Sequence, residues 1–216
     1  MSSSKKLIIV CCGGFAREVH WLAQACQQEW TVVGFIDDTE SLQGQTVCDS
    51  PVLGKIEDWK NFPDASFVVA LGSPRDRKAI VEKMESLGKV SFATLIHPSV
   101  QYSKYVQFGE GTIVAAGCII TTHVTIGRHC NLNLGCTIGH DASFGDYCTL
   151  APQAIISGNV TLGAGIEIGT GATLIEKISV GSGSFIGAGS IVTKTLPESG
   201  FFAGSPARQI RSIEDF

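Results

Sequence analysis

Apolar residues recur at every sixth position through the C-terminal half of the chain, without a break. The series has fifteen members: Phe108, Val114, Ile120, Ile126, Leu132, Ile138, Phe144, Leu150, Ile156, Leu162, Ile168, Leu174, Val180, Ile186 and Val192. A step of six is divisible by two but not by 3.6, so an extended chain places all of them on one side, whereas a helix would scatter them. Hexapeptide repetition of this kind predicts a parallel β-helix.

The residues beside this series support the same prediction. The residue after each marker is usually glycine, alanine or serine, which suits a chain that turns a tight corner. The residue two before each marker is small or apolar and shares the inward face of a pleated chain. With three hexapeptides to a triangular coil, the fifteen markers predict five coils stacked over roughly 24 Å. The unbroken spacing also predicts that no large loop leaves this prism.

Residues 1–95 predict a separate α/β domain of Rossmann-like βαβ type, ahead of the β-helix domain of residues 96–216. Leu7–Val10 indicates a short buried strand, and Gly13-Gly14 a tight turn after it. A helix follows, because four apolar residues keep helical spacing: Val19, Leu22, Ala23 and Cys26. Trp30–Ile36 predicts the next strand, and Asp37-Asp38 stands at its end.

A second strand-turn-helix unit follows in the same domain. Phe67–Leu71 predicts a strand, Ser73 a helix N-cap, Pro74 the first helical position and Gly88 the helix stop. The carboxyl ends of parallel strands share one edge of a sheet, so we expect both turns and the Asp pair to meet in one crevice. The candidate binding residues there are Gly13, Gly14, Asp37, Asp38 and Gly72.

This crevice does not match a dinucleotide site. The stretch Cys11–Ala16 lacks the three spaced glycines of the Rossmann fingerprint. About 95 residues are also too few for two mononucleotide halves. A nucleotide fragment, such as the head of a nucleotide-linked substrate, fits better than NAD. The alternative that the glycines only make turns stays open.

The composition argues against two classes of binding partner and indicates the cellular compartment. The 216 residues are 44% apolar and carry a net charge of -4, which gives no support to a nucleic-acid or anionic-membrane partner. No apolar run approaches the roughly 20 residues that span a bilayer, and the apolar start leads into a helix, unlike a signal peptide. Four of the eight cysteines occupy inward positions of the repeat as small hydrophobes: Cys118, Cys130, Cys136 and Cys148. A reduced, cytoplasmic protein is therefore expected.

His140 stands out among the five histidines. It follows Ile138-Gly139 at a predicted corner, outside the packed interior, and Asp141 is its immediate neighbour. At a corner two adjacent side chains lie on one side, so the carboxylate fixes the tautomer of the imidazole, as a general base requires. An exposed His-Asp pair without function remains the alternative.

The other histidines do not indicate a metal site. Trimeric β-helix carbonic anhydrases bind zinc through three histidines, but the separations between His123, His129 and His140 do not match that ligand geometry. His20 lies on the first predicted helix and His97 precedes a proline at the domain junction, so both are expected to be structural or exposed.

Seven motifs follow one another through the whole chain: Val10–Val19, Gly34–Asp38, Val69–Ser73, Leu95–Pro98, Asn133–Tyr147, Ile156–Val160 and Gly204–Ala207. Together they resemble the sugar acyltransferases related to sialic acid O-acetyltransferase and to the bacillosamine-pathway N-acetyltransferase. The stretch Asn133–Tyr147 is similar to their active-site coil. Two departures are Cys11-Cys12, where relatives more often have Gly and Ala, and Thr149, where some have a second histidine.

The resemblance implies a left-handed β-helix, an exception to the usual right-handed crossover, that assembles as a homotrimer with acetyl-CoA between neighbouring prisms and no metal. His140 would be the general base, Asp141 the residue that tunes it, and Asn133 a group near the acceptor. The N-terminal crevice would hold the nucleotide of a UDP- or dTDP-linked amino sugar through Gly13, Gly14, Asp37, Asp38, Gly72 and Arg75. Contacts to coenzyme A would come from Thr149, Gly158, Thr170 and Ala188.

The favoured function is direct acetyl transfer from acetyl-CoA to the 4-amino group of a nucleotide-linked sugar. Cys136 and Cys148 flank the site in sequence, but their inward parity argues against an acyl-cysteine intermediate. O-acetylation of a sialic acid or another free sugar is the alternative within enzymes. A non-catalytic trimeric scaffold or sensor is the alternative from another class.

Overall fold

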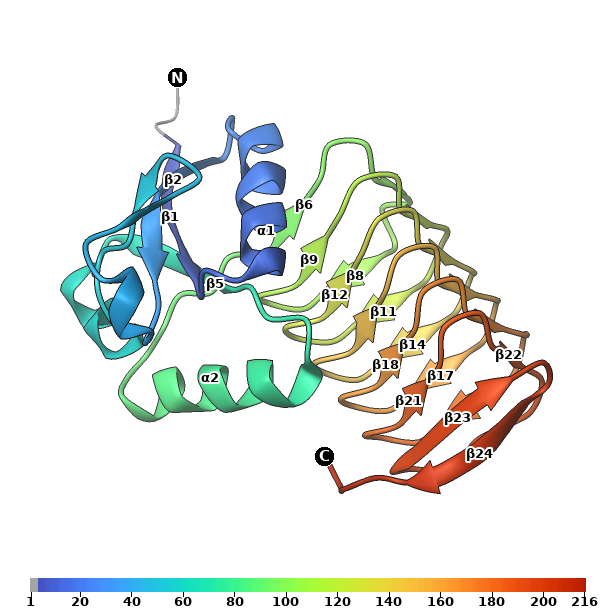
Figure 1. Cartoon of the computed structure of the whole chain (residues 1–216). Coiled ribbons are helices and arrows are strands. Elements are labelled where there is room, and N and C mark those ends of the chain that lie inside the picture. Colours follow the sequence, from blue (N-terminus) through green and yellow to red (C-terminus); the bar gives the residue numbers. More distant parts are fainter. Residues whose placement is uncertain (1–3) are drawn as a thin grey trace.

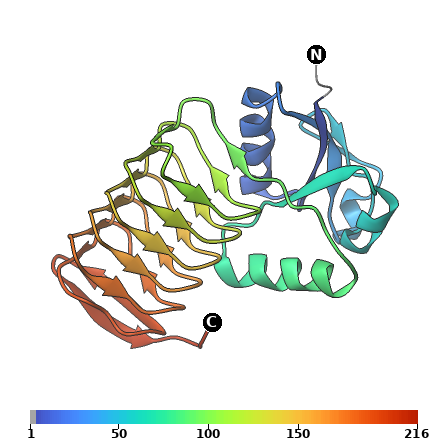
Figure 2. The ribbon, with the colours of Figure 1, turned by 180° about the vertical axis from the view of Figure 1, so that it is seen from behind.

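The computed structural model describes residues 4–216 and places an α/β domain beside one end of a long triangular prism (Figure 1). The early coils of the prism lie next to the α/β domain, and the hairpin of β23 (Gly200–Gly204) and β24 (Ala207–Ser212) closes the far end (Figures 1 and 2). The predicted fold class, an α/β unit followed by a left-handed parallel β-helix, is confirmed.

Three parallel strands form the sheet of the α/β domain, in the order β2-β1-β5. They are β1 (Lys5–Val10), β2 (Trp30–Ile36) and β5 (Ala65–Val69). Helix α1 (Gly14–Ala25) begins directly after Gly13 and buries the predicted apolar positions Val19, Leu22 and Ala23 against this sheet. The predicted βαβ unit is therefore present.

Helix α2 (Pro74–Ser86) has the predicted start and stop. The Ser73 hydroxyl accepts a hydrogen bond of 3.4 Å from the Asp76 N–H, and Gly88 follows the helix with a φ of +148°. Strand β5 ends two residues earlier than predicted, because the carbonyls of Leu71 and Gly72 leave the sheet and accept hydrogen bonds from Arg77. Within residues 4–216, no helix has both the length and the apolar character needed to cross a membrane.

The connection from β2 to β5 contains elements that the sequence did not predict. They are the short 3₁₀ helix η1 (Glu40–Leu42), the hairpin of β3 (Thr46–Val47) and β4 (Ser50–Pro51), and the 3₁₀ helix η2 (Ile56–Asn61). None of these segments is long enough to show a hydrophobic period. Of these, β4 and η2 pack against β2.

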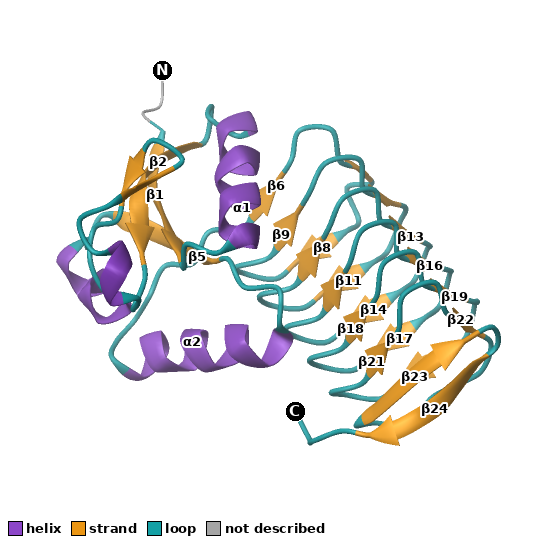
Figure 3. Ribbon diagram, in the orientation of Figure 1, coloured by secondary structure: helices purple, strands orange, loops and turns teal. Residues whose placement is uncertain are grey.

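The prism consists of two-residue strands that recur every six residues and form three parallel sheets (Figure 3). The first sheet contains β6 (Leu95–Ile96), β9 (Ile113–Val114), β12 (Asn131–Leu132), β15 (Thr149–Leu150), β18 (Glu167–Ile168) and β21 (Phe185–Ile186), followed by β23 and β24. The second contains β7 (Gln101–Tyr102), β10 (Ile119–Ile120), β13 (Thr137–Ile138), β16 (Ile155–Ile156), β19 (Thr173–Leu174) and β22 (Ile191–Val192). The third contains β8 (Gln107–Phe108), β11 (Thr125–Ile126), β14 (Ser143–Phe144), β17 (Thr161–Leu162) and β20 (Ser179–Val180).

The chain turns three corners in each coil. We call the turn from the first sheet to the second the first corner, the turn from the second to the third the second corner, and the turn from the third back to the first the third corner. Corner residues stand above one another, because a given strand pairs with the strand 18 positions later, as Thr137 does with Ile155. The second corner is the edge of the prism opposite the first sheet.

The interior of the prism follows the predicted parity. The four inward cysteines are fully buried, and all eight cysteines of the chain are free thiols. No large loop interrupts the strands between Phe108 and Val192, as the spacing predicted. The coils begin earlier than the fifteen markers indicated, since β6 and β7 precede them and Ile96 and Tyr102 continue the step of six. Tyr102 has the same strand position as the buried Ile120, and it is half exposed because β7 is the edge strand of the second sheet.

Candidate active site

His140 and Asp141 form a hydrogen-bonded pair on the second corner, between β13 and β14. His140 Nδ1 lies 2.7 Å from Oδ2 of Asp141, and the two side chains are 57% and 54% exposed. Asp141 has a left-handed backbone with a φ of 58°, which Asp tolerates better than most residues. Because a carboxylate only accepts hydrogen bonds, Nδ1 is the donor in this pair, and Nε2 is the acceptor nitrogen of that tautomer. The predicted exposed corner position of this pair is confirmed.

The His140 ring packs against the backbone of Gly158. Gly158 stands one coil further along the second corner, and a methyl group on it would lie 2.7 Å from Nε2 and 2.8 Å from Cε1 of His140. The imidazole thus occupies the space that any side chain at this position would take. The His140 carbonyl also accepts a hydrogen bond of 2.8 Å from the Asn159 N–H. Three predicted site residues therefore meet on this corner.

Three other predicted residues stand on the first corner instead. Thr170 and Ala188 are exposed and belong to successive coils, and the Thr170 carbonyl accepts a hydrogen bond of 2.8 Å from the Gly189 N–H. Asn133 lines an apolar groove between α1 and the prism, to which Phe15 and the 59% exposed Trp21 also contribute. Apart from Thr149, which belongs to the first sheet, the candidate residues of the prism are thus divided between two of its edges.

The predicted nucleotide crevice is open at both glycine turns. A methyl group on Gly13 or on Gly72 would meet nothing within 4 Å. Gly14 begins α1, and the Arg17 guanidinium lies 3.8 Å from the space that a side chain at Gly14 would fill. The first-turn N–H groups of a helix attract anions. The crevice therefore combines free space, backbone donors and a nearby cation.

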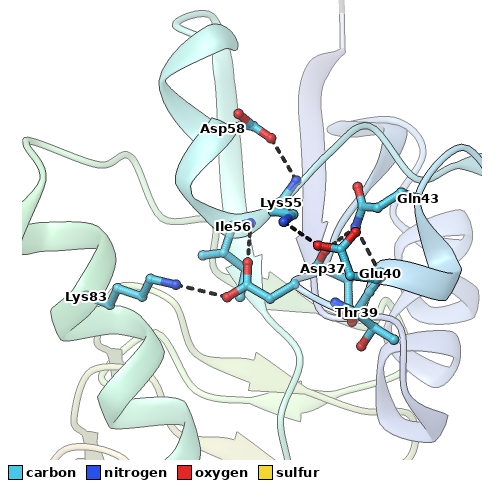
Figure 4. Close-up of polar contacts among 9 residues, drawn as sticks. Asp37, Thr39, Glu40, Gln43, Lys55, Ile56, Asp58 and Lys83 are labelled. Atoms are coloured by element: carbon cyan, nitrogen blue, oxygen red, sulfur yellow. Dashed lines mark hydrogen bonds and ion pairs between the residues drawn. The ribbon is translucent and has the colours of Figure 1, made fainter.

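Asp37 and Asp38 accept hydrogen bonds from neighbouring segments of the same domain (Figure 4). The Asp37 carboxylate accepts hydrogen bonds of 2.8 Å from the N–H groups of Cys12 and Thr39, which fixes the first glycine turn to the end of β2. Asp38 accepts 2.9 Å bonds from the Ile56 N–H and from Lys83 Nζ. Burial alone would raise the pKa of Asp38, but these two bonds outweigh it and the pKa lies below its usual value.

The two cysteines of the first turn are held as neutral thiols. Burial and the nearby Asp37 carboxylate raise the pKa values of Cys11 and Cys12 to about 12. Neither is therefore a thiolate at neutral pH, and neither is a nucleophile. Cys11 has a left-handed backbone with a φ of 78°, a conformation that glycine adopts without strain.

Arg75 is engaged by the last residues of the chain. Its guanidinium donates hydrogen bonds to the carbonyls of Glu214 and Asp215, the latter at 2.6 Å, and lies 5.8 Å from the Phe216 ring. Phe216 itself packs over Gly165 and toward Tyr147. Arg75 joins α2 to this segment, and its predicted role in substrate binding would require it to leave these carbonyls.

The interface between the domains contains a buried arginine that was not predicted from the sequence. Arg77 of α2 is fully buried, and its guanidinium donates to the carbonyls of His129 and Tyr147 at 2.7 Å and to that of Gly72 at 3.0 Å. Burial lowers the pKa of Arg77 to about 10, so it stays charged at neutral pH. Arg77 fixes the Gly72 turn to the third corner of the prism. In sequence it is indistinguishable from the solvent-exposed residues of an amphipathic helix.

Thr149 serves the same interface. Its side chain is 8% exposed, and its hydroxyl donates to the Gly72 carbonyl at 2.7 Å and accepts from Arg77 Nη2 at 3.0 Å. Asn131, one coil earlier on the first sheet, donates 2.8 Å to the Leu71 carbonyl. Thr149, predicted to contact coenzyme A, thus uses its hydroxyl within the chain.

His129 is the aromatic centre of this interface. Its ring lies edge-on to Phe92, with the ring centroids 4.6 Å apart, and stacks on Tyr147 at 5.4 Å. Burial, with smaller contributions from Arg128 and Arg77, lowers the pKa of His129 to about 3. The imidazole is therefore neutral at physiological pH. His20 is also buried, and its Nε2 lies 3.0 Å from the Ser50 hydroxyl, so of the two alternatives left for it, structural or exposed, the structure shows the first.

Comparison with known proteins identifies relatives of both parts. A family model described as the PglD N-terminal domain matches residues 6–84. UDP-N-acetylbacillosamine N-acetyltransferase of Bacillus subtilis (strain 168) is 37% identical over 114 residues, 52% of this chain and 52% of that protein. The match thus spans about half the length of this curated relative.

Two groups of solved structures match nearly the whole chain. A histidine-to-asparagine variant of perosamine N-acetyltransferase from Caulobacter crescentus, in complex with CoA and GDP-perosamine, is 30% identical with a TM-score of 0.88, over 96% of this chain and 97% of that one. The acetyltransferase domain of PglB from Neisseria gonorrhoeae FA1090, in complex with acetyl coenzyme A, is 30% identical with a TM-score of 0.89, over 96% and 100%. The chain belongs, over nearly its whole length, to the PglD-like family of N-acetyltransferases.

Proposed function

We propose that this protein transfers the acetyl group of acetyl-CoA to the amine of a nucleotide-linked amino sugar. The observation that carries the proposal is the exposed His140-Asp141 pair, in which Nδ1 is bonded to the carboxylate and the imidazole ring packs against Gly158. Relatives that align over nearly the whole chain bind CoA with GDP-perosamine, or acetyl coenzyme A.

His140 acts as the general base in this reaction. Nε2 removes a proton from the amine while the nitrogen attacks the thioester carbonyl, the new C–N bond forms and the C–S bond breaks. The proton on Nε2 then passes to the departing thiolate, so the base is regenerated. Asp141 keeps the imidazole in the tautomer that leaves Nε2 unprotonated. The buried cysteines take no part, because their side chains point into the prism.

The nucleotide binds in the crevice of the α/β domain. Its diphosphate meets the N–H groups of the Gly13-Gly14 turn at the start of α1 and the Arg17 guanidinium. Asp37 and Asp38 keep their intramolecular bonds, since carboxylates repel phosphate. Gly72 leaves the second turn open to the nucleoside.

Acceptor and base come from different subunits in this proposal. His140 stands on the second corner, opposite the first sheet, whereas the α/β domain packs over the first sheet through Arg77 and Asn131. A sugar held by the domain of one chain therefore meets His140 of another chain. The site is complete only in an oligomer.

The outward residues of the second sheet support a homotrimer. Three isoleucines, Ile119, Ile155 and Ile191, project outward there with 43%, 44% and 38% exposure, whereas the third sheet presents serine, threonine and glutamine at the same strand position. Apolar side chains on one face of a prism favour burial against copies of that face. Three second sheets around a threefold axis bring the first corner of each subunit to the second corner of the next.

This arrangement gathers the predicted residues into one groove. Asn133, Thr170 and Ala188 from one subunit would face His140, Asp141 and Gly158 from its neighbour. Acetyl-CoA would lie along this groove on the later coils, where Thr170 and Ala188 stand. Thr149 has no part in it, because it is buried under the α/β domain.

A thiol-release assay with acetyl-CoA tests the proposal. The acceptors are GDP-, UDP- and dTDP-linked 4-amino sugars, with free sialic acid as the O-acetylation control. We expect release only with a nucleotide-linked amino sugar, a kcat about 10²- to 10⁴-fold lower in His140→Ala, and a smaller decrease in Asp141→Asn. Acetylation of free sialic acid would favour the O-acetyltransferase alternative. Undiminished transfer by His140→Ala would refute the proposed mechanism, and absence of transfer to every acceptor would favour a scaffold.

A further inference from the structure

The exposed apolar side chains of the prism gather on the second sheet and on the two corners beside it. They are Ile119, Ile155 and Ile191 on the outward face of the sheet, Leu134 on the first corner, and Tyr105 and Ile175 on the second corner. The described part of the prism exposes only two other large hydrophobic side chains, Tyr102 on the edge strand β7 and Ile210 in the closing hairpin. The apolar face proposed for the trimer therefore extends onto both of its edges.

A groove between α1 and the first corner continues this surface onto the α/β domain. Ala115 and Ala116 line it between His97 and Asn133, which stand one coil before and one coil after Ala115. From α1 the groove receives Trp21, which is 59% exposed. A sugar would leave most of its hydroxyls unpaired against so apolar a lining. Exposed aromatic side chains beside an apolar groove are instead typical of protein interfaces.

Tyr105 and His123 form a stacked aromatic pair on the second corner. Their ring centroids are 4.7 Å apart and their planes 9° from parallel. Tyr105 is 53% exposed, and His123 is exposed as well. Strands pair in register across 18 positions, so Tyr105, His123 and Asp141 stand above one another in successive coils. The aromatic pair thus occupies the two coils that precede the coil of His140.

The groove and the second corner share three coils. Along the chain these coils contain His97 with Tyr105, Ala115 with His123, and Asn133 with His140. A threefold axis along the prism relates the subunits without a shift along that axis, so each coil meets the same coil of its neighbour. Where Asn133 faces His140 of the next subunit, the aromatic pair of that subunit faces the groove.

The charges of the two surfaces are also complementary. Glu18 of α1 lines the groove. Lys104 lies on the second corner, with its Nζ 5.1 Å from the centroid of the Tyr105 ring. Neither residue forms an ion pair with another residue of the range 4–216. Opposite charges at the rims of two surfaces favour their association.

We propose that Tyr105 and His123 of one subunit pack into the groove of the next subunit, against its Trp21. The inference rests on the proposed function and its trimer. It names the occupant of the groove as a second copy of this chain.

This contact joins the α/β domain of one chain to the prism edge that carries His140 in another. Helix α1 begins at the Gly13-Gly14 turn, so a fixed α1 also fixes the nucleotide crevice. His123 stands one coil from His140 on the same corner. The aromatic contact therefore sets the distance between the bound nucleotide and the base that serves it, and it closes the early end of the shared site.

Sedimentation of Trp21→Ala, Tyr105→Ala and the double variant over a range of concentrations tests the contact. Both side chains are exposed in the single chain, so the variants should fold. We expect each single substitution to raise the concentration at which the trimer dissociates about tenfold, as for an aromatic residue inside an interface. The double variant should show less than the product of the two effects, because both substitutions remove the same contact.

The matched control is Ile210→Ala, which removes a side chain as exposed as Trp21 but outside this surface, and it should leave the dissociation unchanged. Unchanged dissociation in both single variants, or independent effects in the double variant, would overturn the inference while the proposed function stood. A higher KM for the nucleotide-linked sugar in Trp21→Ala, without weaker assembly, would also overturn it, because the groove would then hold the acceptor. A wild-type protein without acetyl transfer would instead overturn the proposed function.

Cysteine cross-linking of the assembled protein gives a second measurement, which does not depend on the strength of the trimer. The variant carries Trp21→Cys and Tyr105→Cys, with Cys48→Ser to remove the exposed native thiol. A short bismaleimide should join its subunits into covalent dimers and trimers, and neither single-cysteine variant should cross-link. Absence of cross-linking in the double-cysteine trimer would contradict the contact.

Discussion

The imidazole of His140 lies against the backbone of Gly158, where a methyl group would stand 2.7 Å from Nε2. The contact joins two consecutive coils of the second corner and sets the height of the ring above the prism. Because the ring is exposed on its other side, it can move outward to admit a methyl group. The position of the proposed base is thus determined by the absence of a side chain at residue 158.

Gly158→Ala should therefore reduce transfer without unfolding the prism. A displacement of about 1 Å at a catalytic group can lower the rate about 10²-fold, and we expect a fall in kcat of about ten- to a hundredfold. The melting temperature should change little, since the displaced group is the tip of an exposed side chain. Thr161→Ala on β17, which removes an exposed side chain three residues further on, is the control and should keep full activity. A wild-type kcat in Gly158→Ala would show that the ring position is not set by this contact.

Arg77→Met should destabilise the protein strongly. The substitution leaves the carbonyls of His129, Tyr147 and Gly72 without their charged donor in a buried interface. We expect the free energy of unfolding, measured in urea, to fall by about 3 to 5 kcal/mol. Arg75→Met, two residues away on the same helix, loses only exposed contacts to the last residues of the chain and should cost under about 1 kcal/mol. Similar losses in the two variants would contradict the role of Arg77 as the buried link between the domains.

His129 should make the protein less stable in weak acid. Its pKa is about 3 in the folded protein and about 6.5 when exposed, so below pH 6.5 the unfolded chain binds a proton that the folded chain does not. The stabilisation is fully present above about pH 6.5 and decreases by about 1.4 kcal/mol per pH unit as the pH falls toward 3. Burial also lowers the pKa of His20, which adds to the trend in the same direction.

Urea unfolding between pH 7.5 and 5 measures this dependence. His129→Asn, which does not titrate and tolerates the left-handed backbone at φ 52°, should be less stable at neutral pH but should lose less stability on acidification. Equal slopes in the wild type and the variant would show that His129 is accessible to protons in the folded state.

Ile155→Lys should dissociate the proposed trimer. The residue projects from β16 of the second sheet, and a charge there would have to be desolvated in the interface. Light scattering after gel filtration should give a trimer for the wild type and a monomer for the variant, and transfer activity should disappear with the trimer. Thr161→Lys, at the same strand position of the third sheet, should remain trimeric and active. A monomeric, fully active wild-type protein would contradict both the trimer and the two-subunit site.

Most of the prism could be predicted because the sequence of each strand is enough to show which of its side chains point inward. In a pleated chain, parity alone decides which side chains point inward, and the six-residue step adds the positions of the corners. This was enough to place Cys118 and Cys148 in the core and His140 on an exposed edge. The first turn of α2 was equally predictable, since Ser73 and Pro74 suit a helix start in any context.

The elements between β2 and β5 could not be predicted in the same way. The hairpin at Thr46–Pro51 and the 3₁₀ helix η2 are too short to show a period, and they exist because they pack along β2. The roles of several site residues could not be predicted from the sequence either. Arg75 and Thr149 have ordinary outward positions in their own elements, and their partners lie about 140 and 77 positions away in the chain.

The amino-acid pattern was sufficient to specify which residues of the prism point inward, where the coils turn, and that His140 and Asp141 share an exposed corner. These are properties of a local repeat, and they recur because the strands of each coil pair in register with those of the next. Which outward faces are covered became clear only from the folded chain: Arg77 of the α/β domain is buried against Thr149 of the prism, and His140 stands on the edge opposite the first sheet. The docking of a distant segment depends on the shape and polarity of two whole surfaces. A repeat in the local sequence therefore does not predict it.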